Sequence, residues 1–398
     1  MQTLTPIEYL KVDIANNFSG SLDKQDWDDR IAWFDQNEEH LSELVDKAED
    51  PALYYAGVEA YDKALSGKPS GYPISLDACS SGLQILACLV GCEDSAKLCG
   101  VVSTGHREDA YTNIYQFMCD EIGDAAKIDR KDTKHAIMTS LYASTAIPKE
   151  VFGEGELLEV YHNTMEEKAP GAWELNKSLQ ELWQPDALSH DWVLPDNFHA
   201  HIKVMEGTTQ HVQFMNEPIP VHLKENIGTK EGRSISPNII HSIDGMIVRE
   251  ITRRCSFNRQ TIIDVINALD GHGVGIGREE DLMVAKLWTH YLESGFLSTR
   301  ILPYLDKTNM GLVDPLVIAN MVKTLPEEPF EVISIHDCFR VLPNHGNDLR
   351  HQYNQILSDI SKSDLLSYIA SQVVGKKLQA QKFGDISAQI LEADYTLS

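Results

Sequence analysis

Two aspartates, Asp77 and Asp337, each closely follow a short run of apolar and β-branched residues. Such runs predict β-strands, so each carboxylate is expected near a strand end. Between them lies a basic segment, residues 130–143, with a helical pattern. Two carboxylates can hold a pair of Mg²⁺ ions about 4 Å apart, one activating an attacking hydroxyl and the other stabilising a leaving pyrophosphate oxygen. With a cationic helix to hold a triphosphate, this is the chemistry of nucleotidyl transfer.

The basic segment presents one chemically mixed face. Arg130, Lys134, Met138 and Tyr142 are each four residues apart and therefore share one side of a helix. Arg130 and Lys134 would bind phosphates, Met138 would contact a base, and Tyr142 would approach the sugar. A basic helix face is usually only solvated surface, so the functional interpretation depends on the flanking aspartates.

The elements expected around Asp77 are a strand and a helix. The sequence predicts a strand over 74–77 and a helix over 82–90, for which Ser80 and Ser81 are possible N-caps. Asp77 would then lie at a strand-to-helix turn, fixed by rigid elements yet open to solvent and metal.

The second aspartate is expected on a hairpin tip. Residues 331–343 form two short β-runs hinged at His336 and Asp337. His336 could orient the metal site, touch the primer terminus or brace the hairpin, and these roles stay open. Asp244 precedes a glycine, which predicts a turn with a conformational role rather than a metal ligand.

The remaining pattern is mainly helical. Helices are predicted within 24–66 and 104–143, and Pro148, Gly153 and Gly155 should end the second block. Polar and apolar residues alternate around Glu206, Gly207 and Thr208, which predicts a β-hairpin there. An ordinary exposed hairpin and a DNA-reading one both remain possible.

Length and charge set outer limits. A chain of 398 residues is long enough for two or three domains with a substantial core. Lys and Arg total 34 against 60 Asp and Glu, for a net charge of −26. Proteins that bind nucleic acid unaided usually carry a basic surface, so any DNA affinity should be local or supplied by another chain.

Cysteine usage and hydropathy indicate the cellular compartment of the protein. The seven cysteines form no C-x-x-C pair, and Cys88, Cys92 and Cys99 recur at helical spacing in an apolar stretch. Buried free thiols are therefore expected rather than disulfides or zinc ligands. No apolar run reaches the length of a membrane span, and the first residues lack a signal-peptide pattern. These features predict a cytoplasmic protein without a membrane partner.

Four short motifs follow one another along the chain. They are Asp77 with Ser81, Gly82 and Gln84; Arg130, Lys134, Met138 and Tyr142; His241, Asp244 and Gly245; and His336, Asp337 and Phe339. In type, spacing and order they resemble the motifs of the single-subunit DNA-dependent RNA polymerases of phages and mitochondria. Weaker signals extend the likeness over nearly the whole chain from about residue 17.

The resemblance implies an α/β (α+β) fold, the right-hand polymerase architecture, in which the palm carries an antiparallel sheet and the fingers are helical. It implies that Asp77 and Asp337 are catalytic and hold two Mg²⁺ ions together with the backbone carbonyl of Ala78. Arg130 and Lys134 would bind the triphosphate. Further substrate contacts would come from Gly82, Tyr111, Met138, Tyr142, His241 and His336.

The sugar preference follows from side-chain size. DNA-copying relatives of this fold have a bulky acidic residue in the first motif that blocks a 2′-hydroxyl, whereas this chain has the small Gly82. Tyr142 and His241 could hydrogen-bond that hydroxyl, and a site built to pair a hydroxyl disfavours substrates that lack it. We therefore expect rNTPs as substrates, although a histidine such as His241 is more often only structural.

Two local departures from the family are present. Position 143 is Ala where the family has Gly, which adds a methyl group at a crowded point. The long interval between Asp244 and Asp337 predicts an insertion at about 256–326, more consistent with a structural or protein-binding module than with a phosphate loop. The implied domains are a helical module, palm, fingers and palm again, at 1–70, 71–93, 94–241 and 242–398.

A third departure concerns the start of the chain. Relatives carry long upstream regions that build an N-terminal domain, a thumb and part of the palm, whereas the first metal motif here lies at Asp77. We expect these parts to be absent and supplied by a second subunit, as in the heterodimeric RNA polymerase II of Schitoviridae-type podophages. This resemblance implies action in the cytoplasm of an infected bacterial host, with recruitment by a single-strand-binding protein.

The expected function is template-directed RNA synthesis on DNA from rNTPs, as the catalytic subunit of a DNA-directed RNA polymerase. One alternative is a DNA polymerase of the same superfold, which the small Gly82 disfavours. Another is a catalytically silent scaffold that binds DNA or a partner. Retention of both aspartates disfavours the scaffold, because buried like charges destabilise a protein unless metal is bound.

Overall fold

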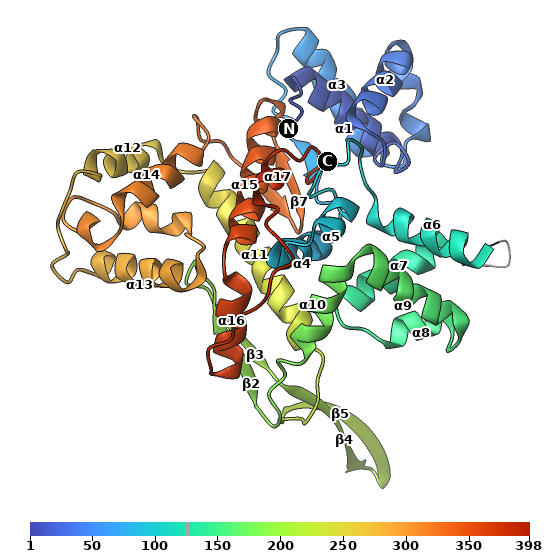
Figure 1. Ribbon diagram of the computed structural model, residues 1–398. Coiled ribbons are helices and arrows are strands. Elements are labelled where there is room, and N and C mark those ends of the chain that lie inside the picture. Colours follow the sequence, from blue (N-terminus) through green and yellow to red (C-terminus); the bar gives the residue numbers. More distant parts are fainter. Residues whose placement is uncertain (124–127) are drawn as a thin grey trace.

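A three-stranded antiparallel sheet joins distant parts of the chain. The computed structural model describes residues 1–123 and 128–398 (Figure 1). Strand β1 (Ile74–Asp77) pairs with β7 (Cys338–Val341), and β7 pairs with β6 (Ile333–Ile335), which gives the order β1-β7-β6. The predicted strand before Asp77 and the predicted hairpin around Asp337 are thus confirmed, and they belong to one sheet.

The main core forms where three helices meet beside this sheet. Helix α4 (Ser81–Val90) contacts both α11 (Ile235–Cys255) and α15 (Gly346–Lys362), which also contact each other. Every residue of α4 is buried. A helix that is apolar on all sides, as this one nearly is, is stable only inside a core. The helix predicted over 82–90 is confirmed.

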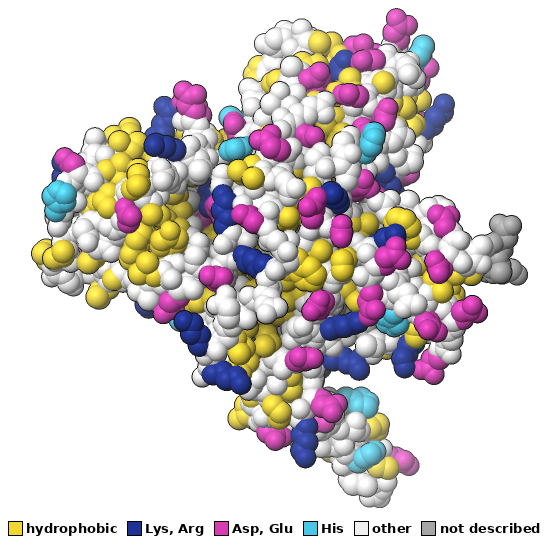
Figure 2. Space-filling view, in the orientation of Figure 1, with side chains coloured by type: hydrophobic (Ala, Val, Ile, Leu, Met, Phe, Trp, Pro, Cys, Tyr) yellow, Lys and Arg dark blue, Asp and Glu magenta, His cyan; other side chains and the backbone are white. Residues whose placement is uncertain are grey.

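The N-terminal part is helical, as predicted for 24–66. Its helices pack on one another at the edge of the main core (Figure 1). The first helix begins with a capping box, in which Thr5 and Glu8 satisfy each other's backbone N–H groups. On the face shown in Figure 2, acidic side chains are numerous over these helices. The elements are α1 (Pro6–Phe18), α2 (Trp27–Asn37), η1 (Glu38–Glu43), η2 (Val45–Lys47) and α3 (Pro51–Leu65).

A second helical group follows α4. Its members are α5 (Glu93–Leu98), α6 (Ala110–Ile122), α7 (Arg130–Leu141), α8 (Ala146–Phe152), α9 (Glu156–Lys168) and α10 (Pro170–Gln180). The prediction that Pro148 ends the helical block is wrong, because Pro148 lies in the first turn of α8. Proline is tolerated there because backbone N–H groups of a first turn have no partner within the helix.

Two hairpins follow these helices. Strand β2 (Ser189–Val193) pairs with β3 (His199–Lys203), and β4 (Met205–Phe214) pairs with β5 (Glu217–Asn226). The hairpin predicted around Glu206, Gly207 and Thr208 is present, and all three residues lie within its first strand, β4. The chain turns at Met215 and Asn216, which both have positive φ. This is the requirement of a two-residue type I′ turn.

Residues 256–326 pack around a hydrophobic cluster of their own, separate from the main core. The cluster gathers apolar residues from several short helices, which lie together on the left of Figure 1. These elements are α12 (Arg259–Ala268), α13 (Glu279–Ser294), η4 (Thr299–Tyr304), η5 (Met310–Leu312) and α14 (Pro315–Thr324). The segment predicted as an insertion is thus a packed unit, which we call the 256–326 module.

After β7 the chain returns to the core through η6 (Pro343–His345), α15, α16 (Leu365–Val374) and α17 (Ser387–Leu391). All seven cysteines are free thiols, as predicted, and Cys88, Cys92 and Cys99 are buried. Among the helices that the structure describes, none is both long and apolar enough to cross a membrane.

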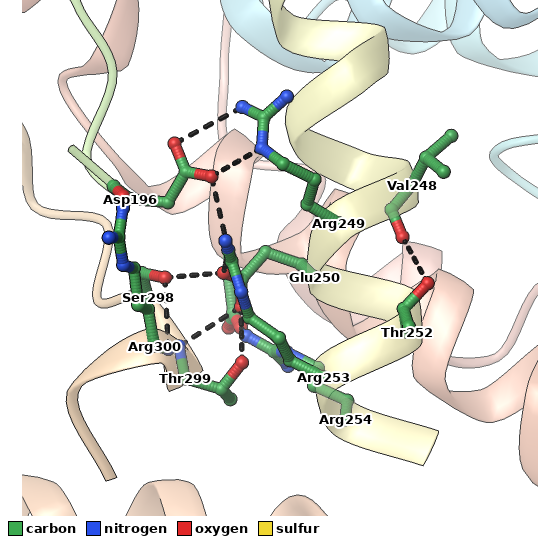
Figure 3. A network of polar contacts seen from close by, with 11 residues as sticks. Asp196, Val248, Arg249, Glu250, Thr252, Arg253, Arg254, Ser298, Thr299 and Arg300 are labelled. Atoms are coloured by element: carbon green, nitrogen blue, oxygen red, sulfur yellow. Dashed lines mark hydrogen bonds and ion pairs between the residues drawn. The ribbon is translucent and has the colours of Figure 1, made fainter. Parts of the chain in front are cut away.

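A buried network of ions joins α11 to the 256–326 module (Figure 3). The fully buried side chain of Glu250 accepts hydrogen bonds from Ser298 and Thr299, the latter through both backbone N–H and hydroxyl, at 3.0 and 2.7 Å. Arg253 bridges Glu250 and Asp196, at 2.9 and 3.0 Å. Since Asp196 lies between β2 and β3, one network fixes a hairpin, a helix and the module.

Replacing Glu250 with Ala should lower the free energy of unfolding by about 3 kcal/mol. The change removes one of the two carboxylates that pair with Arg253 and with the buried Arg254, and it leaves the Ser298 and Thr299 hydroxyls without their acceptor. Urea denaturation at neutral pH measures this change. Glu327→Ala, at an exposed position after α14, is the matched control and should change stability by less than about 0.5 kcal/mol. An equal loss in both variants would contradict the role given to the network.

Candidate active site

The sheet register brings Asp77 and Asp337 to the same strand end. Asp77 is the last residue of β1 and pairs with Cys338, the residue after Asp337. The backbone N–H of Ala78 donates to the carbonyl oxygen of Asp337 over 3.2 Å. Asp77 is exposed and Asp337 is half-buried, so both carboxylates remain accessible from solvent.

The two carboxylates also interact electrostatically. The side chain of Asp77 reaches solvent, but the protein packed around it limits its hydration. This desolvation, followed by the negative charge of Asp337, raises the pKa of Asp77 to about 6. A raised pKa means that the ionised form is disfavoured in the protein alone. A bound divalent cation would remove this penalty.

A third carboxylate, Asp244, lies close enough to Asp337 for their charges to interact. The prediction that Asp244 begins a turn is wrong, because Asp244 lies in the middle of α11. The Asp-Gly pair was misread because α11 is held by buried isoleucines on both sides of it, and tertiary packing outweighs the turn preference. Burial and then Asp337 raise the pKa of Asp244 to about 6, so this residue also faces the site.

The donor set fits Mg²⁺ better than a transition metal. Over residues 1–123 and 128–398, no group of three or more His, Cys, Asp or Glu side chains is placed to enclose a metal ion. Mg²⁺ does not need such a cage, because it is commonly held by one or two carboxylates with water and substrate phosphates as the other ligands. Asp77 and Asp337 supply two carboxylates of this kind.

Tyr142 and His241 lie together opposite the first turn of α4. Their rings stack with centroids 4.8 Å apart and an angle of 9° between the planes. A Cβ atom added at Gly82 would lie 3.2 Å from the Tyr142 hydroxyl. The absence of a side chain at Gly82 therefore leaves room for that hydroxyl. Burial raises the pKa of Tyr142 to about 12, so the hydroxyl keeps its proton at neutral pH.

The middle of the α7 face that begins at Arg130 and ends at Tyr142 lies over the connection between β1 and α4. The Lys134 ammonium is 5.1 Å from the ring centroid of Tyr111, and the Tyr111 hydroxyl is 3.0 Å from that of Ser80. Ser80 is at the N-cap position of α4, but its side chain makes no capping hydrogen bond. Lys134 and Met138 are both exposed, as residues that meet a ligand must be.

Arg130, at the start of the face, is held by neighbouring side chains. Its guanidinium pairs with Asp109 and donates to the Thr112 hydroxyl at 2.7 Å. Asp109 also caps α6 by accepting from the backbone N–H groups of Tyr111 and Thr112. The carboxylate of Asp109 therefore fixes the orientation of the Arg130 side chain. The role of Arg130 as a phosphate ligand stays a prediction.

Two positions near the site have backbone conformations that L-residues seldom adopt. Ala143, directly after Tyr142, has a φ of 66° and is buried. Glycine, which the resemblance leads one to expect at this position, would be free of strain in this conformation, whereas Ala143 is strained. His336 has a φ of 56° and is exposed at the β6–β7 turn, where it makes the turn tight enough to present Asp337.

Sequence reasoning missed two contributors. Arg107 is nearly buried, lowers the pKa of Asp77 and donates from Nε to the Ser398 hydroxyl at 2.9 Å. Ser398 in turn exchanges two backbone hydrogen bonds with Asp77, at 3.2 and 2.9 Å. Arg107 lies in a charged run without periodicity, so only the fold reveals that it faces Asp77.

Residues 4–193 match the family model of DNA-dependent RNA polymerase. Mitochondrial DNA-directed RNA polymerase 1B of Nicotiana tabacum is 28% identical, over 35% of this chain and 17% of the relative. Mitochondrial DNA-directed RNA polymerase 1 of Arabidopsis thaliana is 27% identical, over 35% and 18%. The matches thus cover under a fifth of each relative.

The family match covers part of the site. It includes β1, α4 and α7, and with them Asp77, Gly82 and Tyr142, but it ends before His241 and Asp337. The likeness to DNA-dependent RNA polymerases therefore comes from the first half of the chain. The placement of Asp337 beside Asp77 is an independent observation from the fold.

Divalent-cation affinity at this site should rise with pH. Asp77 has a pKa of about 6 and must lose its proton to become a metal ligand, so the apparent affinity should increase about tenfold between roughly pH 5 and 7 and then level off. Calorimetric titration with Mn²⁺ measures this increase. Asp77→Asn should weaken binding and abolish the pH dependence, and a pH-independent affinity in the unaltered chain would contradict the assignment.

Proposed function

We propose that this chain carries the catalytic centre of a DNA-directed RNA polymerase, which joins rNTPs to the 3′ end of an RNA on a DNA template. The observation that carries the proposal is the meeting of Asp77 and Asp337 at one strand end, next to the Tyr142 end of α7. The family match over residues 4–193 supports the same reaction.

In this proposal Asp77 and Asp337, with the backbone carbonyl of Ala78, would hold two Mg²⁺ ions. Such ions, when bound, lower the pKa of an attacking hydroxyl and stabilise charge on a leaving oxygen. Lys134 and Arg130 would bind the triphosphate, with Lys134 exposed and Arg130 aligned by Asp109. Met138, exposed on the same face, would contact the base.

Selection of the ribose is assigned to the Tyr142–His241 pair. The Tyr142 hydroxyl stays protonated and lies beside Gly82, so it can donate to or accept from a 2′-hydroxyl placed there. A 2′-deoxynucleotide bound there would shield this half-buried hydroxyl from water without offering it a partner, which costs binding energy. Tyr111 and His336 would make further contacts with the substrate.

A more specific proposal concerns the protein partners of this chain. A net charge of −26 opposes the binding of nucleic-acid phosphates, so we propose that a second polypeptide supplies most of the basic surface for template and product. On the basis of the sequence resemblance, we further propose a two-chain phage enzyme that acts in the cytoplasm of an infected bacterium and is recruited by a single-strand-binding protein. Full extension activity by the isolated chain would contradict this part.

Asp77→Asn and Asp337→Asn should each reduce nucleotide addition by at least about 10³-fold, because each removes a ligand from both metal-dependent steps. Primer extension on a DNA template with labelled rNTPs measures the loss, with the partner-containing complex from the native host as the enzyme. Asp264→Asn, on α12 in the 256–326 module, is the matched control and should retain full activity. Substantial extension by either site variant would refute the metal assignment, and preferential use of dNTPs would indicate a DNA polymerase.

Tyr142→Phe should reduce the preference for rNTPs over dNTPs at least tenfold, because the variant keeps the ring stack on His241 and loses only the hydroxyl. The ratio of kcat/KM values for GTP and dGTP measures this preference. Tyr55→Phe, at an exposed position of α3, is the matched control. An unchanged ratio in Tyr142→Phe would remove the tyrosine from sugar selection.

A further inference from the structure

The β4–β5 hairpin has no role in the proposed chemistry, yet it is the most protruding part of the molecule. It extends from the body at the lower end of Figure 1, and Figure 2 shows it standing clear of the other elements. Its strands, Met205–Phe214 and Glu217–Asn226, are ten residues each. A two-stranded hairpin alone is only marginally stable in water, so an arm of this length suggests that something binds it.

The register divides the hairpin into an apolar face and a polar face. Directly paired residues share a face, and faces alternate along each strand. The pair Val212 and Ile219 therefore lies on the same face as Phe214, Val221 and Leu223. These five side chains are between 36% and 59% exposed. Contiguous apolar side chains at such exposure mark interaction sites on soluble proteins.

The other face is more polar, although Met205, Pro218 and Pro220 also lie on it. It carries Thr209, His211, His222 and Lys224, and the Thr209 hydroxyl lies 3.0 Å from Nδ1 of His222. The two faces therefore differ in polarity because apolar and polar residues alternate along both strands.

Glutamates flank the apolar residues on their own face. Glu206 and Glu225 are paired directly at the base of the hairpin, and Glu217 is paired with Phe214 beside the tip. Like charges placed directly opposite one another on a sheet destabilise it. Cationic groups from a partner would relieve this repulsion at the base and complement Glu217 at the tip.

Two prolines limit how a partner can bind. Pro218 and Pro220 alternate along β5, and the two-residue turn places them at positions where a backbone N–H would point away from β4. The outer edge of β5 therefore lacks two donors for an added strand in the half nearest the tip. This weakens strand addition there and favours binding to the apolar face.

We propose that this face, made of Val212, Phe214, Ile219, Val221 and Leu223 with its three flanking glutamates, docks a protein segment. The segment has an apolar strip with Lys or Arg at both ends. This inference goes beyond the proposed catalytic function and does not depend on it.

Charge decides between this partner and two others. The hairpin carries three glutamates and one lysine, and the lysine is on the opposite face, so the apolar face repels the phosphates of DNA. A second copy of the same face would bring glutamates against glutamates, which disfavours self-association. A basic amphipathic segment satisfies both the apolar residues and their acidic flanks.

The test uses the full chain and a displayed library of random 16-residue peptides. Selection on the unaltered chain should enrich peptides with an apolar centre and Lys or Arg at both ends. Fluorescence anisotropy of the enriched peptides then measures affinity for three variants. The face variant is Val212→Thr with Ile219→Thr and Val221→Thr, which keeps high β-propensity. The flank variant replaces Glu206, Glu217 and Glu225 with Gln, and the opposite-face control carries His211→Thr and Gln213→Thr.

We expect the face variant to bind at least tenfold more weakly, the flank variant to bind more weakly with a smaller salt dependence, and the control to bind within twofold of the unaltered chain. Because the flank variant keeps every apolar side chain, it tests the proposal even if the face variant is unstable. The proposal is overturned if no such peptides are enriched, or if they bind all variants equally. It is also overturned if a 20-base-pair DNA duplex binds the unaltered chain and loses affinity in the face variant.

Discussion

The pairing of β1 with β7 is the constraint on which the rest of the structure depends. It joins Asp77 to Cys338 in one register, and so it holds two like-charged carboxylates close together at a strand end. The raised pKa of Asp77 is the electrostatic consequence of this closeness and of burial. Backbone hydrogen bonds and a buried core offset that repulsion, as the proposed cation site would require.

Three helices position the other groups relative to this strand end. The first turn of α4 contains Gly82, which leaves room for Tyr142, and α11 supplies both His241 and Asp244. The C-terminal end of α11 is in turn fixed by the Glu250 network to the 256–326 module. The module therefore has a structural connection to the site, through the helix that carries the histidine of the proposed ribose contact.

Local patterns predicted much of this arrangement. A β-branched run before each aspartate was sufficient for β1 and for the β6–β7 hairpin, and the four-residue spacing from Arg130 to Tyr142 was sufficient for the face of α7. The errors arose where distant contacts outweigh local preference. Asp244 and Gly245 are helical because α11 is packed in the core. The turn of the β4–β5 hairpin is formed by Met215 and Asn216, and neither of these positions is a glycine that would have marked the turn in the sequence. The pairing of Arg130 with Asp109 and the approach of Arg107 to Asp77 require the fold and have no signal in the sequence.

The central claim is that Asp77 and Asp337 jointly bind divalent cations in the presence of a nucleotide. Anomalous X-ray diffraction from crystals soaked with Mn²⁺ and a non-hydrolysable GTP analogue tests it most directly. The account predicts two anomalous peaks about 4 Å apart, each within ligand distance of at least one of these carboxylates. Peaks located elsewhere, or a bound nucleotide whose phosphates lie far from both aspartates, would contradict it.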